Sequence, residues 1–203
     1  WEYDNFEWHL EYRMSTLELK ELSHPSGEVI KIASGKTLDL KSQGTTTLPT
    51  GSVLQVVSST KTDKFTLSST TFTTVTGLTA SITPTSSSSK FLVSINVQGS
   101  QDVNANDCFV AIYRDSTPIG VGDTDGSRTR NSFMLMTSAT GWTASGAMTT
   151  LDSPNTASTI TYSVKVAARN SGTIFINRSE SNSDASSGAG SPASSITVQE
   201  IQG

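Results

Sequence analysis

The segment Phe91-Leu92-Val93-Ser94-Ile95-Asn96-Val97-Gln98 places a large apolar side chain at every second residue, at Phe91, Val93, Ile95 and Val97. A period of two is typical of a strand that buries one face. The same alternation recurs twice more, at Ile160, Tyr162, Val164 and Val166 and at Ile196 and Val198. The chain therefore contains several strands that need a common core.

Other short apolar runs, separated by clusters of Ser, Thr, Asp, Gly and Pro, complete the expected strands. We expect them at Val53–Ser58, Asp63–Leu67, Thr71–Val75, Leu78–Thr83, Phe91–Gln98, Cys108–Arg114, Ser132–Thr137, Trp142–Leu151, Thr159–Ala168, Thr173–Arg178 and Ser195–Ile201. Many short strands without helical periodicity predict an all-β protein whose head, residues 53–203, is an antiparallel β-sandwich of jelly-roll type. Its expected interior is Ile82, Phe91, Val93, Ile95, Val97, Phe109, Ala111, Tyr113, Val164, Val166, Ile174, Ile176, Ile196 and Val198.

Composition excludes several kinds of partner. The net charge of the 203 residues is −4, and the 14 Lys and Arg are scattered. Nucleic-acid binding needs a clustered basic surface, so we expect no nucleic-acid partner. No apolar run approaches the roughly 20 residues of a membrane span, so we expect no membrane insertion. The single cysteine, Cys108, is interpreted as a small buried apolar residue.

The first 22 residues form an expected anchor segment. From Phe6 to Met14 the chain alternates, with large apolar side chains on one face and charged or polar ones on the other. An apolar face of this size needs a partner surface. We expect a docking strand that adds to a sheet or groove of another protein or subunit, through Trp1, Phe6, Trp8, Leu10 and Tyr12. The alternative is that this segment packs on its own subunit.

Residues 23–52 are expected to form a neck and linker with two short strands, Glu28–Ile32 and Thr37–Leu40. Two strands of this length are not stable alone. Copies of the chain around a symmetry axis would bury their apolar residues, so we expect a homotrimer. Its neck contacts would be Val29, Ile30, Ile32, Leu38 and Leu40.

No catalytic constellation stands out. Both histidines, His9 and His24, lie outside the expected sandwich, so a serine or cysteine nucleophile would lack a histidine base there. Asp residues in the loops are typical of turns. Asp123-Thr124-Asp125-Gly126 begins like a calcium loop, but Met134 occupies the twelfth position, where Glu would be needed. We expect no enzyme activity, no cofactor and no metal site, and leave an ion near Asp123–Gly126 open.

Two polar loops are the expected receptor contacts, because recognition residues commonly lie on loops held by a rigid scaffold. They are Asp102–Asp107 and Asp123–Arg130, and we expect them at the end of the head opposite the neck. The residues concerned are Asp102, Asn104, Asn106, Asp123, Asp125, Arg128 and Arg130.

Four stretches together carry a family resemblance: Met14–Ile30, Leu48–Val57, Val75–Pro84 and Ser89–Ile95. They resemble fibre and tail-fibre-like virion proteins of marine bacteriophages, particularly phages of cyanobacteria. The C-terminal half also resembles the trimeric jelly-roll heads of the tumour-necrosis-factor and complement-type proteins.

The resemblance implies a homotrimeric fibre, spike or decoration protein located on the virion. It would attach to the capsid or tail through its N-terminus and contact a glycan or protein on the host surface. Two alternatives stay open. One is a carbohydrate-binding module or adhesin outside a virion, and the other is a depolymerase tip.

Overall fold

The computed structural model describes residues 34–35, 48–102, 105, 107–137, 142–181 and 190–203. The chain divides into two units, residues 1–47 and 48–203. In the second unit every regular element described is a β-strand, and all strand pairs are antiparallel, so the predicted all-β fold is confirmed. The anchor and neck residues predicted above lie outside the described residues.

The first sheet contains six strands, of which the long β4 is the centre. Its strands are β1 (Val53–Lys61), β2 (Phe65–Leu67), β4 (Lys90–Gln101), β8 (Ala144–Asp152), β10 (Ile174–Ile176) and β11 (Ser194–Ile201). On one side, β4 pairs first with β11 and then with β10. Farther out, β1 pairs with β11 and β2 pairs with β10. On the other side, β8 pairs with residues 91–99 of β4. The predicted final strand is confirmed as β11, which pairs with both β1 and β4.

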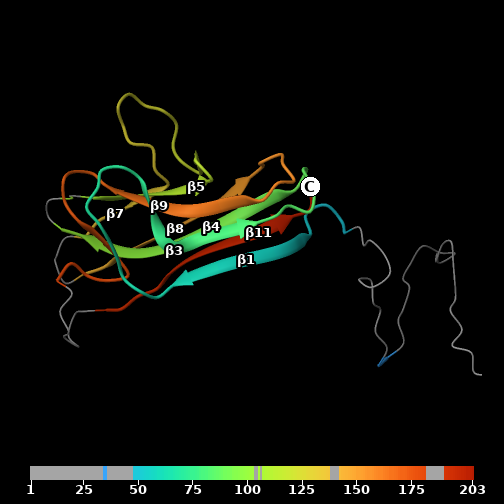
Figure 1. The fold of residues 1–203 in the computed structure, drawn as a ribbon, viewed down its shortest axis with the longest axis horizontal. Helices are drawn as coiled ribbons and strands as arrows, with labels where there is room; N and C mark the ends of the chain where they lie inside the picture. Colours follow the sequence, from blue (N-terminus) through green and yellow to red (C-terminus); the bar gives the residue numbers. More distant parts are fainter. Residues whose placement is uncertain (1–33, 36–47, 103–104, 106, 138–141, 182–189) are drawn as a thin grey trace, which may run out of the picture. The chain divides into compact units, whose positions relative to one another are not determined.

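The second sheet has five strands in the order β3-β9-β5-β6, with β7 also paired to β5. They are β3 (Thr73–Ile82), β5 (Cys108–Arg114), β6 (Thr117–Ile119), β7 (Phe133–Leu135) and β9 (Ile160–Ala168). β7 pairs with the beginning of β5 and β6 with its end. The connection between β6 and β7 stands out from the sandwich (Figure 1).

The inward faces of both sheets bury one apolar core. Eleven of the interior residues predicted from alternation belong to it: Ile82, Phe91, Val93, Ile95, Val97, Val164, Val166, Ile174, Ile176, Ile196 and Val198. Full burial of one such side chain stabilises a fold by about 1.5–3 kcal/mol relative to exposure. The core also holds Tyr162, which is completely buried.

On β5, the prediction that Phe109 and Tyr113 face the interior was wrong, whereas Ala111 is completely buried as predicted. The alternate residues Cys108, Val110 and Ile112 belong to the core. Successive side chains of a strand point to opposite faces, so Phe109 and Tyr113 lie on the side of the sheet away from this core and are only partly buried. Both sets are apolar, and composition alone does not distinguish them.

β3 also differs from the expectation of two strands, at Thr71–Val75 and Leu78–Thr83. It is one strand whose register against β9 shifts between Thr74 and Thr79. Gly77 lies within the irregularity with a φ of 88°, a backbone conformation that glycine adopts readily. β6 was not expected.

The second unit begins and ends at the same end of the sandwich. The Gly51 amide donates to the Gln202 carbonyl at 2.8 Å, and the Gln202 amide donates to the Ser52 carbonyl at 2.8 Å. Figure 1 shows the C-terminus beside the start of β1. At the opposite end, the Asp102 amide donates to the Thr173 carbonyl at 2.9 Å, which joins the β4–β5 and β9–β10 loops.

Candidate functional site

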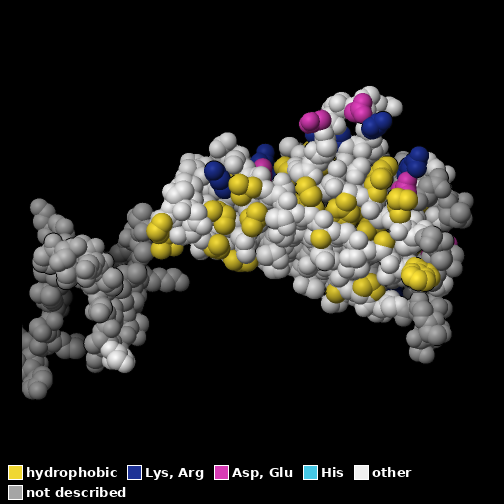
Figure 2. Space-filling view, turned by 180° about the vertical axis from the view of Figure 1, so that it is seen from behind, with side chains coloured by type: hydrophobic (Ala, Val, Ile, Leu, Met, Phe, Trp, Pro, Cys, Tyr) yellow, Lys and Arg dark blue, Asp and Glu magenta, His cyan; other side chains and the backbone are white. Residues whose placement is uncertain are grey.

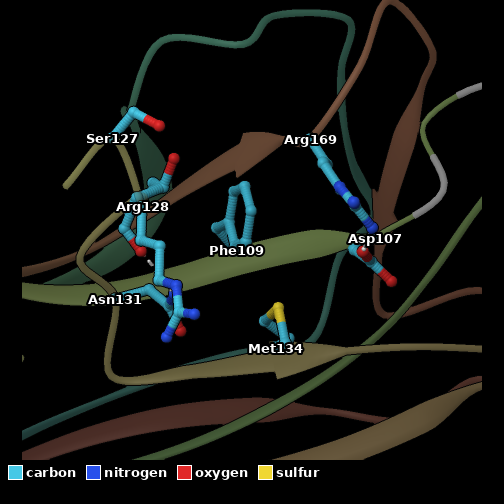
Figure 3. Close-up of a pocket in the computed structure, with 8 residues that line it drawn as sticks. Asp107, Phe109, Ser127, Arg128, Asn131, Met134 and Arg169 are labelled. Atoms are coloured by element: carbon cyan, nitrogen blue, oxygen red, sulfur yellow. Dashed lines mark hydrogen bonds and ion pairs between the residues drawn. The ribbon is translucent and has the colours of Figure 1, made fainter. Parts of the chain in front are cut away.

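A pocket of about 540 Å³ lies over the outward side of β5 and β7, beside the projecting β6–β7 loop. Its lining combines two arginines, one aspartate, small polar residues and two apolar side chains (Figure 3). The residues are Asp107, Phe109, Ser127, Arg128, Thr129, Asn131, Met134 and Arg169.

The apolar floor follows from the orientation of β5. Because Val110 faces the core, Phe109 points outward, and its backbone partner on β7 is Met134. Met134 is exposed, and Phe109 is half-buried. Figure 3 shows the Phe109 ring between the two arginine-bearing walls, with Met134 below it. The floor can therefore contact an apolar surface of a ligand.

One wall is fixed by a partly buried ion pair. Nη1 of Arg169 donates to Oδ2 of Asp107 at 2.9 Å, and the side chains are 59% and 7% exposed respectively. The Arg169 amide also donates to the Asp107 carbonyl at 3.0 Å. The pairing of β5 with β9 brings these residues together, since Cys108 lies opposite Ala168. The guanidinium is thus oriented while most of its surface remains accessible.

The opposite wall belongs to the β6–β7 loop, which carries both acidic and basic side chains (Figure 2). Nη1 of Arg128 lies 2.8 Å from Oδ2 of Asp125, and the Arg128 side chain is 83% exposed. Asn131 donates through Nδ2 to the Thr129 carbonyl at 2.9 Å. An exposed ion pair of this kind contributes only about 0–1 kcal/mol, so Arg128 can exchange Asp125 for another anion.

Of the seven residues predicted to contact a receptor, Arg128 lines this pocket. Arg130 lies on the same loop and donates through Nε to the Gly122 carbonyl at 2.6 Å, while Asp123 and Asp125 are exposed. This loop projects from the sandwich between β6 and β7, whereas the β4–β5 loop lies at the end of the sandwich opposite Gly51 and Gln202.

Asp102 has a structural role in the β4–β5 loop. Its Oδ1 accepts from the Ala105 amide at 2.8 Å, and its Oδ2 accepts from the Thr173 amide at 2.9 Å. Both oxygens therefore bind backbone groups. Asn104 and Asn106 lie outside the described residues.

Sequence reasoning missed most of the pocket. Phe109 and Met134 were assigned to strands, and Arg169 follows the last residue of β9 without a motif around it. The positions of two charged residues contained a signal. Asp107 directly precedes β5 and Arg169 directly follows β9, so antiparallel pairing of these strands brings the two side chains together. Recognising it requires knowing that β5 and β9 are neighbours.

A second pocket, of about 420 Å³, lies between the β2–β3 and β9–β10 loops. Its lining is uncharged and mostly hydroxylated: Ser68, Ser69, Thr70, Ser171, Gly172 and Thr173. The hydroxyls of Ser68 and Thr173 lie 2.9 Å apart and bond to each other. It offers neither a charge nor an aromatic face to a ligand.

The outward face of the first sheet is a second candidate surface. The strands β1, β11, β4 and β8 contain four charged residues, of which Lys61 and Glu200 are buried and Asp152 bonds to Tyr162 across the core. Within the strands β1, β11, β4 and β8, Lys90 at the beginning of β4 is thus the only charged residue on this face. Over β10 of the same sheet, the guanidinium of Arg178 lies 4.2 Å from the ring centroid of the outward Phe175.

A row of mostly apolar side chains crosses that face. Val56 pairs with Gln199, Gln199 with Leu92, and Leu92 with Leu151. Val56 and Leu151 are exposed, Leu151 by 55%. The neighbouring row carries Ser58, Thr197, Ser94 and Thr149. An uncharged surface with large aliphatic groups is suited to contact with another protein.

Three chemical features were compared in the described part of the chain: clusters of metal-ligating side chains, the Cys108 thiol and apolar helices. No group of three or more His, Cys, Asp or Glu residues there could hold a metal ion. Burial raises the pKa of the Cys108 thiol to about 12, which makes it a poor nucleophile. Within the same residues, no helix is long and apolar enough to cross a membrane.

No protein-family model and no curated protein matches this chain.

Proposed function

We propose that the protein is a structural component of a bacteriophage virion, a fibre, spike or decoration protein that displays a trimeric head for attachment to the host. The resemblance of four sequence stretches to marine phage fibre proteins motivates this proposal. The observation that carries it is the row of exposed and partly exposed aliphatic side chains Val56, Leu92 and Leu151 on the outward face of the first sheet, where Lys90 is the only charged residue of β1, β11, β4 and β8.

The strand order supports a jelly-roll head. Disregarding the short strands β2, β6 and β10, the order β1-β11-β4-β8 faces the order β3-β9-β5-β7. The chain changes sheet at each step except from β5 to β7. This succession supports the proposal of an eight-stranded jelly roll, in which two sheets pack face to face.

Threefold assembly gives the uncharged face a partner. Closed cyclic symmetry is the usual arrangement of homo-oligomers, and it would cover the exposed side chains Val56 and Leu151 with a second copy. The predicted neck contacts would add to the same interface. The predicted anchor, residues 1–22, would join the trimer to a capsid or tail protein.

Three measurements test this proposal. Sedimentation equilibrium of the purified chain at micromolar concentration should give the mass of a trimer, and a stable monomer would contradict it. Electron microscopy of particles with this protein labelled should show it on the virion. Deletion of residues 1–13 should reduce its incorporation into particles, and normal incorporation would contradict the anchor.

A carbohydrate-binding module or adhesin outside a virion is the second candidate function. Two observations favour it: the pocket beside Phe109 and the exposed Trp142, whose accessibility is 70%. Exposed aromatic rings can stack on sugar rings. Binding on a glycan array by a protein that is absent from purified particles would favour this candidate.

A further inference from the structure

We propose that the pocket between Arg128 and Arg169 binds a sugar acid, a pyranose that carries a carboxylate, within an acidic host polysaccharide. This inference rests on the proposed function in host attachment and names the ligand class of the site. The carboxylate would bind the guanidinium of Arg128, and the apolar side of the sugar ring would lie on Phe109.

Arg128 is the group suited to the carboxylate. A guanidinium presents its N–H donors in a planar fork that matches the two oxygens of a carboxylate. The existing partner, Asp125, is a surface residue three positions away, and both side chains are largely exposed. Releasing this contact costs little, because exposed pairs are weak. A sugar acid partly removed from water by the pocket is a stronger partner.

Arg169 supplies a donor in a fixed position. Its bond to the buried Asp107 orients the guanidinium, while the exposed part of the group faces the same pocket from the other wall (Figure 3). Because its charge is already balanced by Asp107, Arg169 is better suited to hydroxyl and ring oxygens than to a second carboxylate. Asn131 and Thr129 add polar groups on the Arg128 side.

The floor explains why a sugar fits better than a small inorganic anion. Phe109 and Met134 present apolar surface, which phosphate or sulfate would leave uncovered. A pyranose has a face of C–H groups that can cover an aromatic ring, and hydroxyls that can reach the polar walls. The volume of about 540 Å³ lies within the common range of ligand pockets, roughly 300–1,000 Å³.

The charge pattern distinguishes an acidic sugar from a neutral one. The lining holds two arginines and one aspartate, so its net charge is positive although the chain as a whole carries −4. A neutral sugar would not need Arg128.

The test compares two ligands that differ in one group, methyl β-D-glucuronide and methyl β-D-glucoside. Binding to the full-length chain is measured by isothermal titration calorimetry and saturation-transfer NMR at low salt. We expect the glucuronide to bind at least about tenfold more tightly than the glucoside, because only the glucuronide can form charge-assisted hydrogen bonds with Arg128.

Two loop variants with the same change in net charge provide the matched comparison. Arg128→Gln should weaken glucuronide binding about tenfold and leave glucoside binding unchanged. Arg130→Gln removes a charge from the same loop outside the pocket lining and should change neither. Phe109→Leu, which keeps an apolar floor without the ring, should weaken both sugars. Circular dichroism and thermal unfolding verify that each variant is folded.

Equal binding of the two sugars, no binding of either, or equal effects of Arg128→Gln and Arg130→Gln would overturn the sugar-acid site. These outcomes are distinguishable from failure of the proposed function. A trimer found on particles that does not bind the glucuronide refutes this inference alone. A monomer absent from particles that does bind it refutes the virion proposal alone.

Discussion

The hydroxyl of Tyr162, on β9, donates a hydrogen bond of 2.8 Å to Oδ2 of Asp152, on β8 in the opposite sheet. Arg114, the backbone partner of Tyr162 on β5, donates from Nη1 to both oxygens of the same carboxylate, at 2.7 and 2.8 Å. Burial, followed by the hydrogen bond to Asp152, raises the pKa of Tyr162, so its hydroxyl stays neutral. One carboxylate therefore connects the two layers of the sandwich.

Replacing Asp152 with Ala should destabilise the head by about 3–5 kcal/mol, because it leaves a partly buried guanidinium and a buried hydroxyl without their acceptor. Tyr162→Phe removes one bond and should cost about 1–2 kcal/mol. Urea unfolding measures both losses. Asp123→Ala, in the exposed loop, is the control and should change stability by less than about 0.5 kcal/mol. Equal effects of Asp152→Ala and this control would contradict the connecting role.

Glu200 is a buried carboxylate on β11, the strand between β1 and β4 in the first sheet. Its Oε1 accepts from the amide and hydroxyl of Thr85, both at 2.7 Å, and its Oε2 accepts from Nε2 of Gln55 at 2.5 Å. Burial acts to raise the pKa of Glu200, but hydrogen bonds outweigh it and hold the pKa below the ordinary value of 4.5. The ionised form is thus the one that the folded state favours.

The stability of the head should therefore depend on pH through Glu200. As the pH falls, Glu200 takes up a proton in the unfolded chain before it does so in the folded one. The stabilisation of the fold by ionised Glu200 is therefore complete above the ordinary pKa of 4.5 and is lost as the pH falls through the lower pKa of the folded state. Glu200→Gln should be less stable by about 2 kcal/mol at pH 7. The gap should narrow on acidification in paired urea titrations, whereas parallel profiles would argue against a lowered pKa.

The proposed trimer interface can be tested on Leu151, which is exposed on β8 and lies opposite Leu92. Leu151→Lys should leave the monomer fold intact, because the position is open to solvent, but should disrupt the trimer by placing a charge in an uncharged interface. Sedimentation velocity should then show a monomer at micromolar concentration. Thr79→Lys introduces the same charge at an exposed position of β3, in the other sheet, and should preserve the trimer. Identical behaviour of the two variants would exclude this face from the interface.

Alternation was a reliable guide to the core where only one face of a strand is apolar. In β4, the outward positions hold Leu92, Ser94, Asn96 and Gln98, and the three polar ones identified the inward set. In β5, large apolar residues occupy both sets of positions. Which set of β5 side chains faces the core then depends on how β5 pairs with β7 and β9. The sequence of β5 alone does not specify that pairing.

The pocket was only partly predictable for a related reason. Arg128 was expected to contact a receptor because it lies in a polar loop. Arg169 and Asp107 are 62 residues apart and meet through the pairing of β5 with β9. Phe109 becomes a pocket floor because β5 presents that side to solvent. Such contacts depend on strand order, which local periodicity does not specify.

A final prediction concerns Gly99, at which β4 changes its pairing from β11 to β10. A Cβ atom there would lie 2.6 Å from the Phe175 carbonyl oxygen, on the backbone of the neighbouring strand, and 3.1 Å from Cδ1 of Ile176. Backbone atoms within a sheet cannot move aside easily. Gly99→Ala should therefore destabilise the head by about 1–3 kcal/mol, although alanine in a strand is otherwise favoured over glycine by about 0.5–1 kcal/mol.

Gly122→Ala is the matched control for this substitution, because no atom lies within 4 Å of the added Cβ. Its effect on the free energy of unfolding should stay within about 0.5 kcal/mol. Both variants are compared with the parent chain by urea denaturation. Equal stability of Gly99→Ala and Gly122→Ala would contradict the close approach of β10 to β4 at Gly99.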